Sequence, residues 1–420
     1  MPYTRPGRLR RMFAKIGYPT GLMFAFYSDP TQAVYDHDIH SVVIHRGKDT
    51  RGGGSYPSTM EISMKGRRDQ NLAGHNCRFF LRTEANDAIA AALGLAGTGY
   101  DIRFTGRMGA TTIEDDAGRY TSTIGAASWV SQLGYSSHWT TPTAGESVRT
   151  TLTNLMDASN PLRGISVTFR GTTYPLIAAT QDPVRFRDGV GKYAGDIGIL
   201  LRETRDGVTE VLPLPFRIDQ AEASVAGSVP LTRSQAISPT TWEQKNEYPA
   251  KRVELQYVDS TGVARTSYVE YGTGLRELES NDWSYLQLSG PYDQSQLFRE
   301  AWGRVLESSP ERFTVPKVTV DLLHLIGSDR QYHRDQAARL IKLEAGDPIH
   351  FSGDWPPALQ GVQIAEGITE TITGDRWDLE LSLVPFTIAL GKQTMPTVPA
   401  RAWDSAGNQW DAETRSWDAA

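Results

Sequence analysis

The chain has 420 residues, and its hydrophobic content of 39% is enough to build the cores of about two to four domains. Its net charge of −6 argues against a general nucleic-acid binder, because such proteins carry a basic surface. The single cysteine, Cys77, excludes an intrachain disulfide bond, and no apolar run approaches the roughly 20 residues that span a bilayer. The 39 glycines and 23 prolines favour many strands and turns.

Residues 1–35 are predicted to form an N-terminal arm, because proline and glycine recur through this stretch. A few basic residues are followed by an apolar run, Gly21–Tyr27, which is too short for a signal peptide. We therefore expect the protein to be made in the cytosol.

Residues 36–135 are predicted to form a first β domain. Apolar and polar residues alternate in several stretches, as they do in half-buried strands. These strands are expected at Ile39–His45, Ser58–Lys65, Arg78–Arg82, Asp101–Arg107 and Arg119–Ile124. Alanine-rich or helix-like composition predicts helices at Ala85–Leu93 and Gly125–Leu133.

Residues 136–245 are predicted to form a small α+β domain. Thr143 and Glu146 have the spacing of a capping box before a helix that ends near Pro161. Asp206-Gly207 predicts a β-hairpin. Gly189–Gly195 lacks the pattern of a phosphate loop, so we expect a loop between strands. The strands of this domain are expected at Ile165–Phe169, Ile197–Glu203 and Val208–Pro213.

Residues 246–390 are predicted to form a second β domain, with a helix over 293–308. Its clearest part is Gly346–Phe386, where buried positions alternate with polar ones. Short antiparallel strands of this kind leave open edges, and closure into a barrel removes them. The positions expected on the core face are Ile349, Phe351, Trp377, Leu379, Leu381 and Leu383, and the earlier strands are expected at Arg252–Val258, Arg265–Tyr271 and Phe313–Leu323.

Residues 391–420 form a tail of a different kind, in which Trp403, Trp410 and Trp417 recur with a period of seven, each followed by aspartate. Tryptophan is enriched among the residues that anchor protein interfaces. One interpretation is that the three indoles dock on a partner protein. The other is that the tail folds back on its own domain.

Catalytic and metal-binding patterns are missing from the sequence. The histidines near the first strand, among them His40 and His45, lie on opposite faces of a strand and are expected at the surface. No nucleophile elbow is present. We therefore expect no enzyme, no cofactor and no metal site.

Four stretches, taken in order, carry a resemblance to a known family. They are Val42–Gly47 with Pro57–Ser63, Phe104–Arg107 with Tyr120–Leu133, Lys251–Tyr257, and Leu340–Pro385. Their order and spacing over residues 36–390 resemble the baseplate hub, or tail-tip hub, proteins of tailed bacteriophages. The particular resemblance is to minor tail proteins of siphophages that infect actinobacteria.

The resemblance implies a mainly β fold with an α+β insert: two tandem tail-tube-like β-barrel domains, a small α+β domain and a Trp-rich C-terminal tail. It also implies a homotrimer, whose ring of six barrels would adapt a six-fold tail tube to a three-fold tip and form part of the DNA conduit. The implied partners are the distal tail protein, the C-terminus of the tape-measure protein, and receptor-binding or other tail-tip proteins. The implied location is the tip of the virion tail, with assembly in the host cytoplasm.

Two other functions stay open. A distal tail protein or a carbohydrate-binding receptor protein could stack sugars on aromatic side chains, and the candidates are Trp139, Trp283, Tyr285 and Trp355. A cell-wall hydrolase is the other alternative, although the sequence contains no motif for it.

Overall fold

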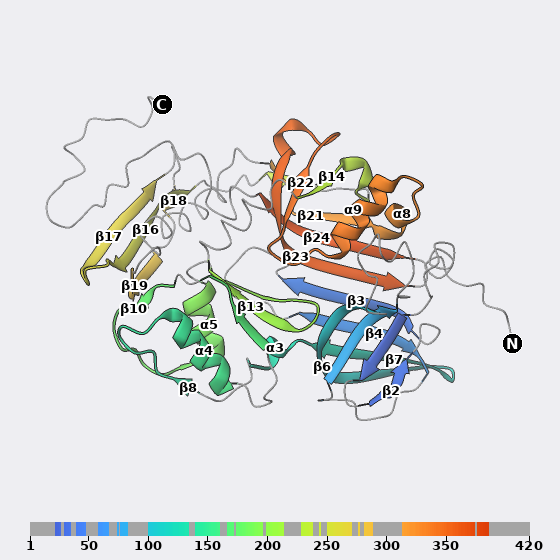
Figure 1. Cartoon of the computed structure of the whole chain (residues 1–420), viewed down its shortest axis with the longest axis horizontal. Coiled ribbons are helices and arrows are strands. Elements are labelled where there is room, and N and C mark those ends of the chain that lie inside the picture. The colour runs from blue at the N-terminus through green and yellow to red at the C-terminus, as the bar shows by residue number, and fades with distance from the viewer. Residues whose placement is uncertain are drawn as a thin grey trace.

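The computed structural model describes residues 22–26, 29–34, 39–47, 58–66, 74, 76–82, 100–133, 139–159, 166–171, 174–195, 199–213, 228–237, 243–244, 250–270, 276–277, 281–288, 313–373 and 376–385. Strands dominate these residues, and the mainly β fold class predicted from the sequence is confirmed. Figure 1 shows strands from early in the chain lying beside strands from its last third.

A sheet of 12 strands contains both of these regions. Its earlier part, here called the first β unit, is antiparallel and has the strand order β3-β4-β7-β6-β5. These strands are β3 (Ile39–Gly47), β4 (Thr59–Lys65), β5 (Asn76–Arg82), β6 (Tyr100–Asp116) and β7 (Arg119–Ala127). The predicted strands of this region are therefore confirmed, and β6 is longer than expected.

Two further strands extend the first β unit from the region expected to be an arm. β1 (Leu22–Phe26) pairs with β5, and β2 (Asp29–Val34) pairs with β1. The structure differs here from the expectation, because a short apolar run does not reveal a distant pairing partner. A second difference concerns the helix expected at Gly125–Leu133. Only α3 (Trp129–Leu133) is helical, because the residues before it pair with β4 as part of β7.

The later part of the sheet, here called the second β unit, comes mainly from residues 313–385. Its strands are β14 (Val229–Leu231), β21 (Lys317–Asp321), β22 (Pro348–Phe351), β23 (Gly361–Thr373) and β24 (Trp377–Pro385). Two helices pack on it, α8 (Leu322–Ile326) and α9 (Gln331–Ile341), and a 3-10 turn covers Pro357–Leu359. The six core-face positions predicted in this region are all buried.

The two β units share one strand plan. In each, a long strand (β6 or β23) forms a hairpin with the next strand (β7 or β24), which pairs in turn with β4 or β21. The first part of the long strand pairs on its other side with β5 or β22. Each long strand has a bulge near the point where that pairing ends. This repeated plan agrees with the prediction of two tandem β domains.

The α+β unit contains α4 (Val148–Ser159) and the hairpin of β12 (Leu200–Glu203) and β13 (Val208–Leu212), with β9 (Ser166–Phe169) parallel to β13. The hairpin at Asp206-Gly207 is therefore confirmed. The helix begins later than its predicted capping box, because Thr143 and Glu146 form a turn. Ser147 accepts a hydrogen bond from the backbone N–H of Arg149 at 3.2 Å in their place.

The expected loop at Gly189–Gly195 is helical. α5 (Phe186–Val190) continues into a π-helical turn at Gly191–Gly195. Phe186, Val190 and Tyr193 are buried in the same core, and this spacing suits a helix better than a loop. The prediction of a loop was wrong, because it weighed the glycines above the buried side chains between them.

A separate sheet packs with the α+β unit. Its strands are β10 (Leu176–Ile177), β16 (Ala250–Val258), β17 (Ala264–Glu270), β18 (Arg276–Glu277) and β19 (Asn281–Gln287). Val253, Leu255 and Trp283 share one core cluster with α4 and α5. The sequence placed β16 and β17 in the second β domain, since alternation identifies a strand but not the sheet that it joins. The domain boundaries themselves stay predictions.

Short elements complete the described chain. They are the paired strands β8 (Trp139–Thr140) and β11 (Val184–Arg185), the paired strands β15 (Glu243–Gln244) and β20 (Phe313–Thr314), and a 3-10 turn at Arg233–Gln235. Among the described helices, none has the length and hydropathy to cross a membrane. The predicted helices at 85–93 and 293–308 lie outside the described residues.

Candidate functional site

The two β units are joined along one strand pair, here called the seam. Residues 367–373 of β23 pair antiparallel with residues 41–47 of β3. β22 pairs with the first residues of β23 on the same side, so β22 and β3 follow one another along this strand. The seam makes one continuous sheet in the order β21-β24-β23-β3-β4-β7-β6.

One face of this sheet is polar and accessible. Because side chains alternate along a strand, every second residue points away from the core. A row of directly paired residues shows its character: Glu380, Thr369, His45 and Thr59. His45 Nδ1 lies 2.9 Å from Thr369 Oγ1 across the seam. This polar face includes Ser41, Val43, His45, Thr59, Glu61, Ser63, Lys65, Glu114, Thr121, Thr123, Thr369, Thr371, Thr373 and Glu380, which are half-buried or exposed.

The polar face is built mainly from short side chains and carries a few charges of both signs. Threonine and serine dominate it, while Glu61, Glu114 and Glu380 are acidic and Lys65 is basic. Lys317 Nζ contacts Glu380 Oε1 at 2.9 Å at the edge of the face. No group of three His, Cys, Asp or Glu side chains in the described residues could hold a metal ion. The face therefore offers mainly short, neutral hydroxyl side chains that water can hydrate.

A buried ionic cluster lies on the core side of the seam. Glu370, on β23, is fully buried and forms a bidentate pair with Arg103 of β6. The two N···O distances are 3.0 and 2.7 Å. Trp377 Nε1 donates to Glu370 at 2.9 Å, and Arg46 of β3 lies 3.4 Å from the same carboxylate. These four residues, here called the seam cluster, connect both β units.

The seam cluster is held in its charged form. Burial alone would raise the pKa of Glu370, but the charges of Arg103 and Arg46 outweigh it and lower the pKa below its ordinary value. Arg46 Nη1 donates to the carbonyl of Arg103 at 2.9 Å, and Arg103 Nη1 donates to the carbonyl of Ile341 at 2.8 Å. These bonds satisfy most donors of the two guanidiniums at a site without water access, as buried ion pairs require, while Arg46 Nε lies 3.9 Å from Glu344 Oε2 and makes no hydrogen bond.

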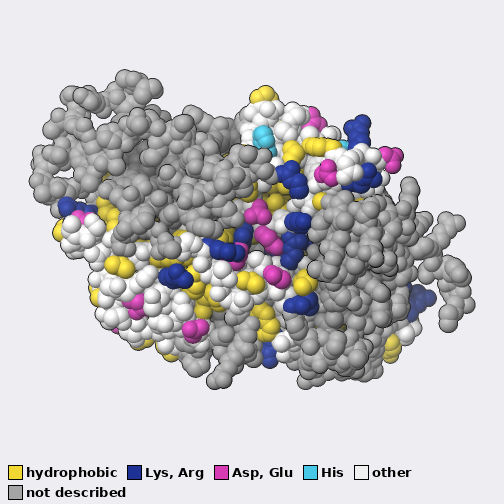
Figure 2. Space-filling model, in the orientation of Figure 1, with side chains coloured by type: hydrophobic (Ala, Val, Ile, Leu, Met, Phe, Trp, Pro, Cys, Tyr) yellow, Lys and Arg dark blue, Asp and Glu magenta, His cyan; other side chains and the backbone are white. Residues whose placement is uncertain are grey.

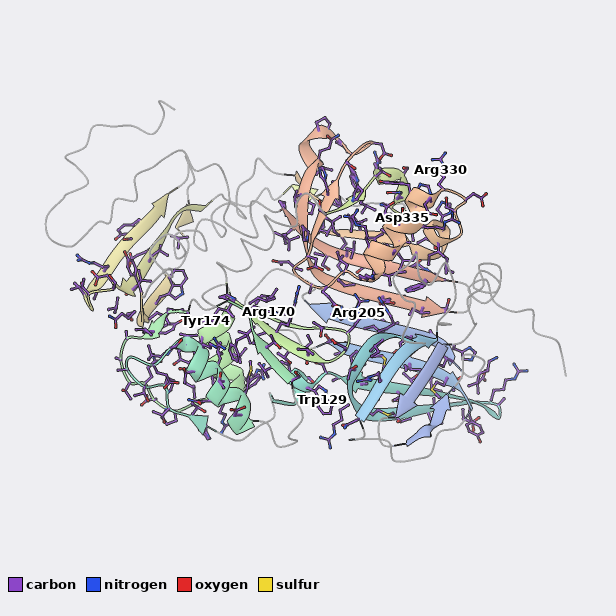
Figure 3. The ribbon with its side chains drawn as sticks, viewed as in Figure 1. Trp129, Arg170, Tyr174, Arg205, Arg330 and Asp335 are labelled. Carbon is purple, nitrogen blue, oxygen red and sulfur yellow. The ribbon has the colours of Figure 1, made fainter. Side chains whose placement is uncertain are left out.

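The turn of the β12–β13 hairpin reaches this cluster from the α+β unit. Arg205 donates to Glu344 Oε1 and to the carbonyl of Ile341, both at 2.8 Å. Thr105 of β6 donates to the carbonyl of Arg205 at 3.2 Å. Ile341 is the last residue of α9, where cations interact favourably with the helix dipole. Figure 3 shows Arg205 at the end of this hairpin that faces the large sheet.

A second row of ion pairs continues away from the seam. Arg170 and Arg202 both bind Glu210, at 2.5 and 2.7 Å, and Arg202 also contacts Asp347 at 3.2 Å. Burial lowers the pKa of Arg202, but Asp347 and Glu210 outweigh it, and the pKa is raised. Basic and acidic side chains gather together at the centre of the face in Figure 2. Of these pairs, Arg202–Asp347 joins the α+β unit to the second β unit, while Glu210 holds Arg170 and Arg202 within the α+β unit.

Glu203 makes a different contact between the α+β unit and the first β unit. Its two carboxylate oxygens accept hydrogen bonds from the backbone N–H groups of Ser58 at 3.1 Å and Val130 at 3.0 Å. Burial is the largest influence on this carboxyl and raises its pKa, although the hydrogen bonds from Val130 and Ser58 oppose the shift. A buried carboxyl thus ties β12 to the segments before β4 and in α3.

The predicted docking residues Trp403, Trp410 and Trp417 lie outside the described residues. Among the sugar-stacking candidates, Trp283 and Trp355 are buried at 2% and 1% exposure, so they offer no ring face to a ligand. Tyr285 donates its hydroxyl to the carbonyl of Lys192. Trp139 is 54% exposed, with Arg185 stacked on its ring. The aromatic candidates are therefore not assembled into one sugar site.

The seam cluster was missed in the sequence, although a signal for it was present. Glu370 stands between Ile368 and Ile372 in an alternating strand, and Arg46 follows Val42 and Ile44 at the same spacing. Alternation places all of these residues on the buried face. A charged residue at a core position predicts a buried partner, but the sequence does not say which one.

No protein-family model matches the chain, and no curated protein matches its sequence. Solved structures with a similar fold include the tail protein from Neisseria meningitidis MC58, with a TM-score of 0.57 at 12% identity. The match covers 87% of this chain and 96% of that one. The 43 kDa tail protein of prophage MuSo2 from Shewanella oneidensis matches with a TM-score of 0.53 at 11% identity, over 89% of this chain and 100% of its own. The chain therefore shares its fold with these phage tail proteins.

Proposed function

We propose that this chain is a structural protein of a phage tail, and that three copies form the hub of the tail tip. The observation that carries the proposal is the continuous sheet, in which two β units of the same plan are joined at a seam and share one polar face. The fold shared with the tail proteins from Neisseria and Shewanella supports the same assignment.

The polar face would line the conduit for DNA. Short threonine and serine side chains keep such a surface wet without offering strong contacts to bases or phosphates. Glu61 and Glu114, together with the net charge of −6, would repel the phosphate backbone and let it slide, while Lys65 and Lys317 offset part of the negative charge of the face. A basic face would hold DNA by phosphate contacts instead.

Two β units in each chain explain how a trimer meets a six-fold tube. Three chains would present six units around the axis, while the α+β units repeat only three times and would lie outside the ring. The seam cluster and the Arg205 contacts hold the units of one chain at a fixed angle. Fixed geometry of this kind is what a closed ring requires.

The partners follow from that position. The distal tail protein would bind above the hub, and the C-terminus of the tape-measure protein would occupy the conduit before infection. Receptor-binding or other tail-tip proteins would bind at the periphery. We assign the chain to the virion of a siphophage that infects actinobacteria, with assembly in the host cytoplasm, and to a role that is structural and not enzymatic.

The tryptophan repeat is the proposed docking element for those peripheral proteins. Deleting residues 401–420, which contain Trp403, Trp410 and Trp417, should leave the ring intact but release peripheral proteins from assembled tips. Tips that keep their full protein content after the deletion would contradict this assignment.

The native mass of the purified chain tests the hub itself. Light scattering at micromolar concentration should give the mass of three chains, and averaged electron micrographs should show rings. A monomer at every concentration would instead favour a peripheral tail protein.

A further inference from the structure

The two β units differ in one respect that bears on how copies of the chain meet. In the second β unit, the remainder of the long strand β23 beyond its bulge is paired with β3. In the first β unit, the corresponding part of β6, residues 109–116, pairs only with β7 among the described residues. These residues are almost all exposed. In the described part of the chain, one strand of the plan is therefore absent beside β6.

At the opposite edge of the sheet, a short segment occupies the position that β3 has in the first β unit. β3 lies antiparallel to β4, and the equivalent of β4 in the second β unit is β21. Outside β21, Ala236 forms an antiparallel bridge with Val320, and the N–H of Ile237 donates to the carbonyl of Thr319 at 2.7 Å. The short segment Ala236–Ile237 thus occupies the position that β3 occupies in the first β unit.

Apolar side chains are exposed at both edges. Ile113 of β6 is 38% exposed, Tyr120 of β7 is 36% exposed, and Ile237 is 37% exposed. Ile113 pairs with Ser122, so Ile113 and Tyr120 lie on the same side of the hairpin. Unpaired strand edges normally carry charges or are covered, because they otherwise pair with another chain. The β6 edge carries charge only at its end, at Glu114, Asp115 and Asp116, and residues 109–113 are uncharged.

We propose that the β6 edge of one copy pairs with the Ala236–Ile237 edge of a second copy, and that this joint repeats the geometry of the seam. The seam shows the expected geometry of this joint, because in the seam the end of the long strand β23 pairs with β3 of the same chain. The proposal rests on the proposed function as an oligomeric hub and identifies the surfaces that close it. The joint is heterologous, since it brings together two different edges, and it can therefore generate a closed ring.

A heterologous joint uses two different edges, so each edge can be blocked separately, which is not possible for a self-complementary interface. A lysine placed at one edge blocks that edge and leaves the other edge of the same copy free. Ile113→Lys should block the β6 edge, and Ile237→Lys should block the opposite edge. Each variant alone should then be a monomer. An equal mixture of the two should form a species of two chains and nothing larger, because one compatible joint remains.

Val263→Lys is the matched control, because Val263 is 47% exposed in the turn between β16 and β17 and belongs to neither edge. It should keep the wild-type mass. Light scattering measures all samples, and thermal unfolding checks that each variant is folded.

The outcomes separate the two proposals. A wild-type trimer whose blocked variants also stay trimeric, or whose mixture stays monomeric, overturns the joint and leaves the hub standing. A wild-type chain that is monomeric at every concentration overturns both.

Discussion

At the scale of single residues, the seam depends on a charge that has no access to water. Glu370 accepts hydrogen bonds from Arg103 and Trp377 at zero exposure, in the middle of an otherwise apolar strand face. A buried ion pair adds little net stability compared with apolar residues, but losing one partner is costly. The main role of the cluster is therefore to determine which strands pair at the seam, and its net contribution to stability is small.

Glu370→Gln should lower the free energy of unfolding by about 3–5 kcal/mol, because two buried guanidiniums lose their counter-charge. The control is Glu380→Gln, which removes the partly exposed pair with Lys317 and should cost about 0–1 kcal/mol. Chemical denaturation of both variants measures the difference. Equal costs would contradict the role given to the buried cluster.

Glu203 predicts a pH dependence of stability. Burial raises its pKa in the folded chain, so the folded state keeps a proton that the unfolded state releases. Its contribution is fully present below the ordinary carboxyl pKa of 4.5 and is lost as the pH rises toward the raised value. Within that window the loss is about 1.4 kcal/mol per pH unit.

Glu203→Gln does not titrate and should lack this loss. The stability advantage of the wild type over the variant should therefore shrink as the pH increases through the window. Denaturant unfolding at a series of pH values measures it. Parallel profiles for the two proteins would show that Glu203 keeps an ordinary pKa.

At the scale of elements, the turn of the β12–β13 hairpin contacts both β units, through Thr105 in the first and Glu344 in the second. Gly207 has a φ of +88°, and a Cβ at this position would lie 2.8 Å from Thr105 Cγ2. The turn therefore needs glycine both for its backbone conformation and for its close approach to β6. Gly262 has nearly the same φ, +84°, but nothing lies within 4 Å of its Cβ position.

This pair of glycines permits a matched experiment. Gly262→Ala should cost about 1–2 kcal/mol for the left-handed backbone alone. Gly207→Ala should cost distinctly more, because the turn must also withdraw from Thr105 and carry Arg205 away from Glu344. Thermal unfolding gives both values. Similar costs would mean that the hairpin turn does not need its contact with β6.

The elements also show what alternation can predict. The strands from Ile39 to Gly47 and from Trp377 to Pro385 were recognised because one face is buried and the other is polar. The helix α9 was missed, since its buried residues include Gln336 and two alanines, which carry a weak apolar signal. Which sheet β16 joins could not be predicted either, because partner choice depends on contacts far apart in the sequence.

At the scale of the whole molecule, a DNA conduit needs a surface that does not hold DNA. Ser63→Lys with Thr371→Lys adds two positive charges to the polar face and should convert it into a DNA-binding surface with a strong dependence on salt. The matched control, Val263→Lys with Thr266→Lys, adds the same charge to the exposed β16–β17 hairpin and should bind much more weakly. Fluorescence anisotropy with labelled DNA at low salt compares them, and equal binding would contradict the assignment.

An electron cryo-microscopy reconstruction of the purified oligomer would show which surface of the chain faces the channel. We expect three chains that form a ring of six β units, with Thr369, Thr371 and Thr123 of each chain facing a central channel. A reconstruction in which this polar face lies on the outside, or is buried against another chain, would contradict this expectation.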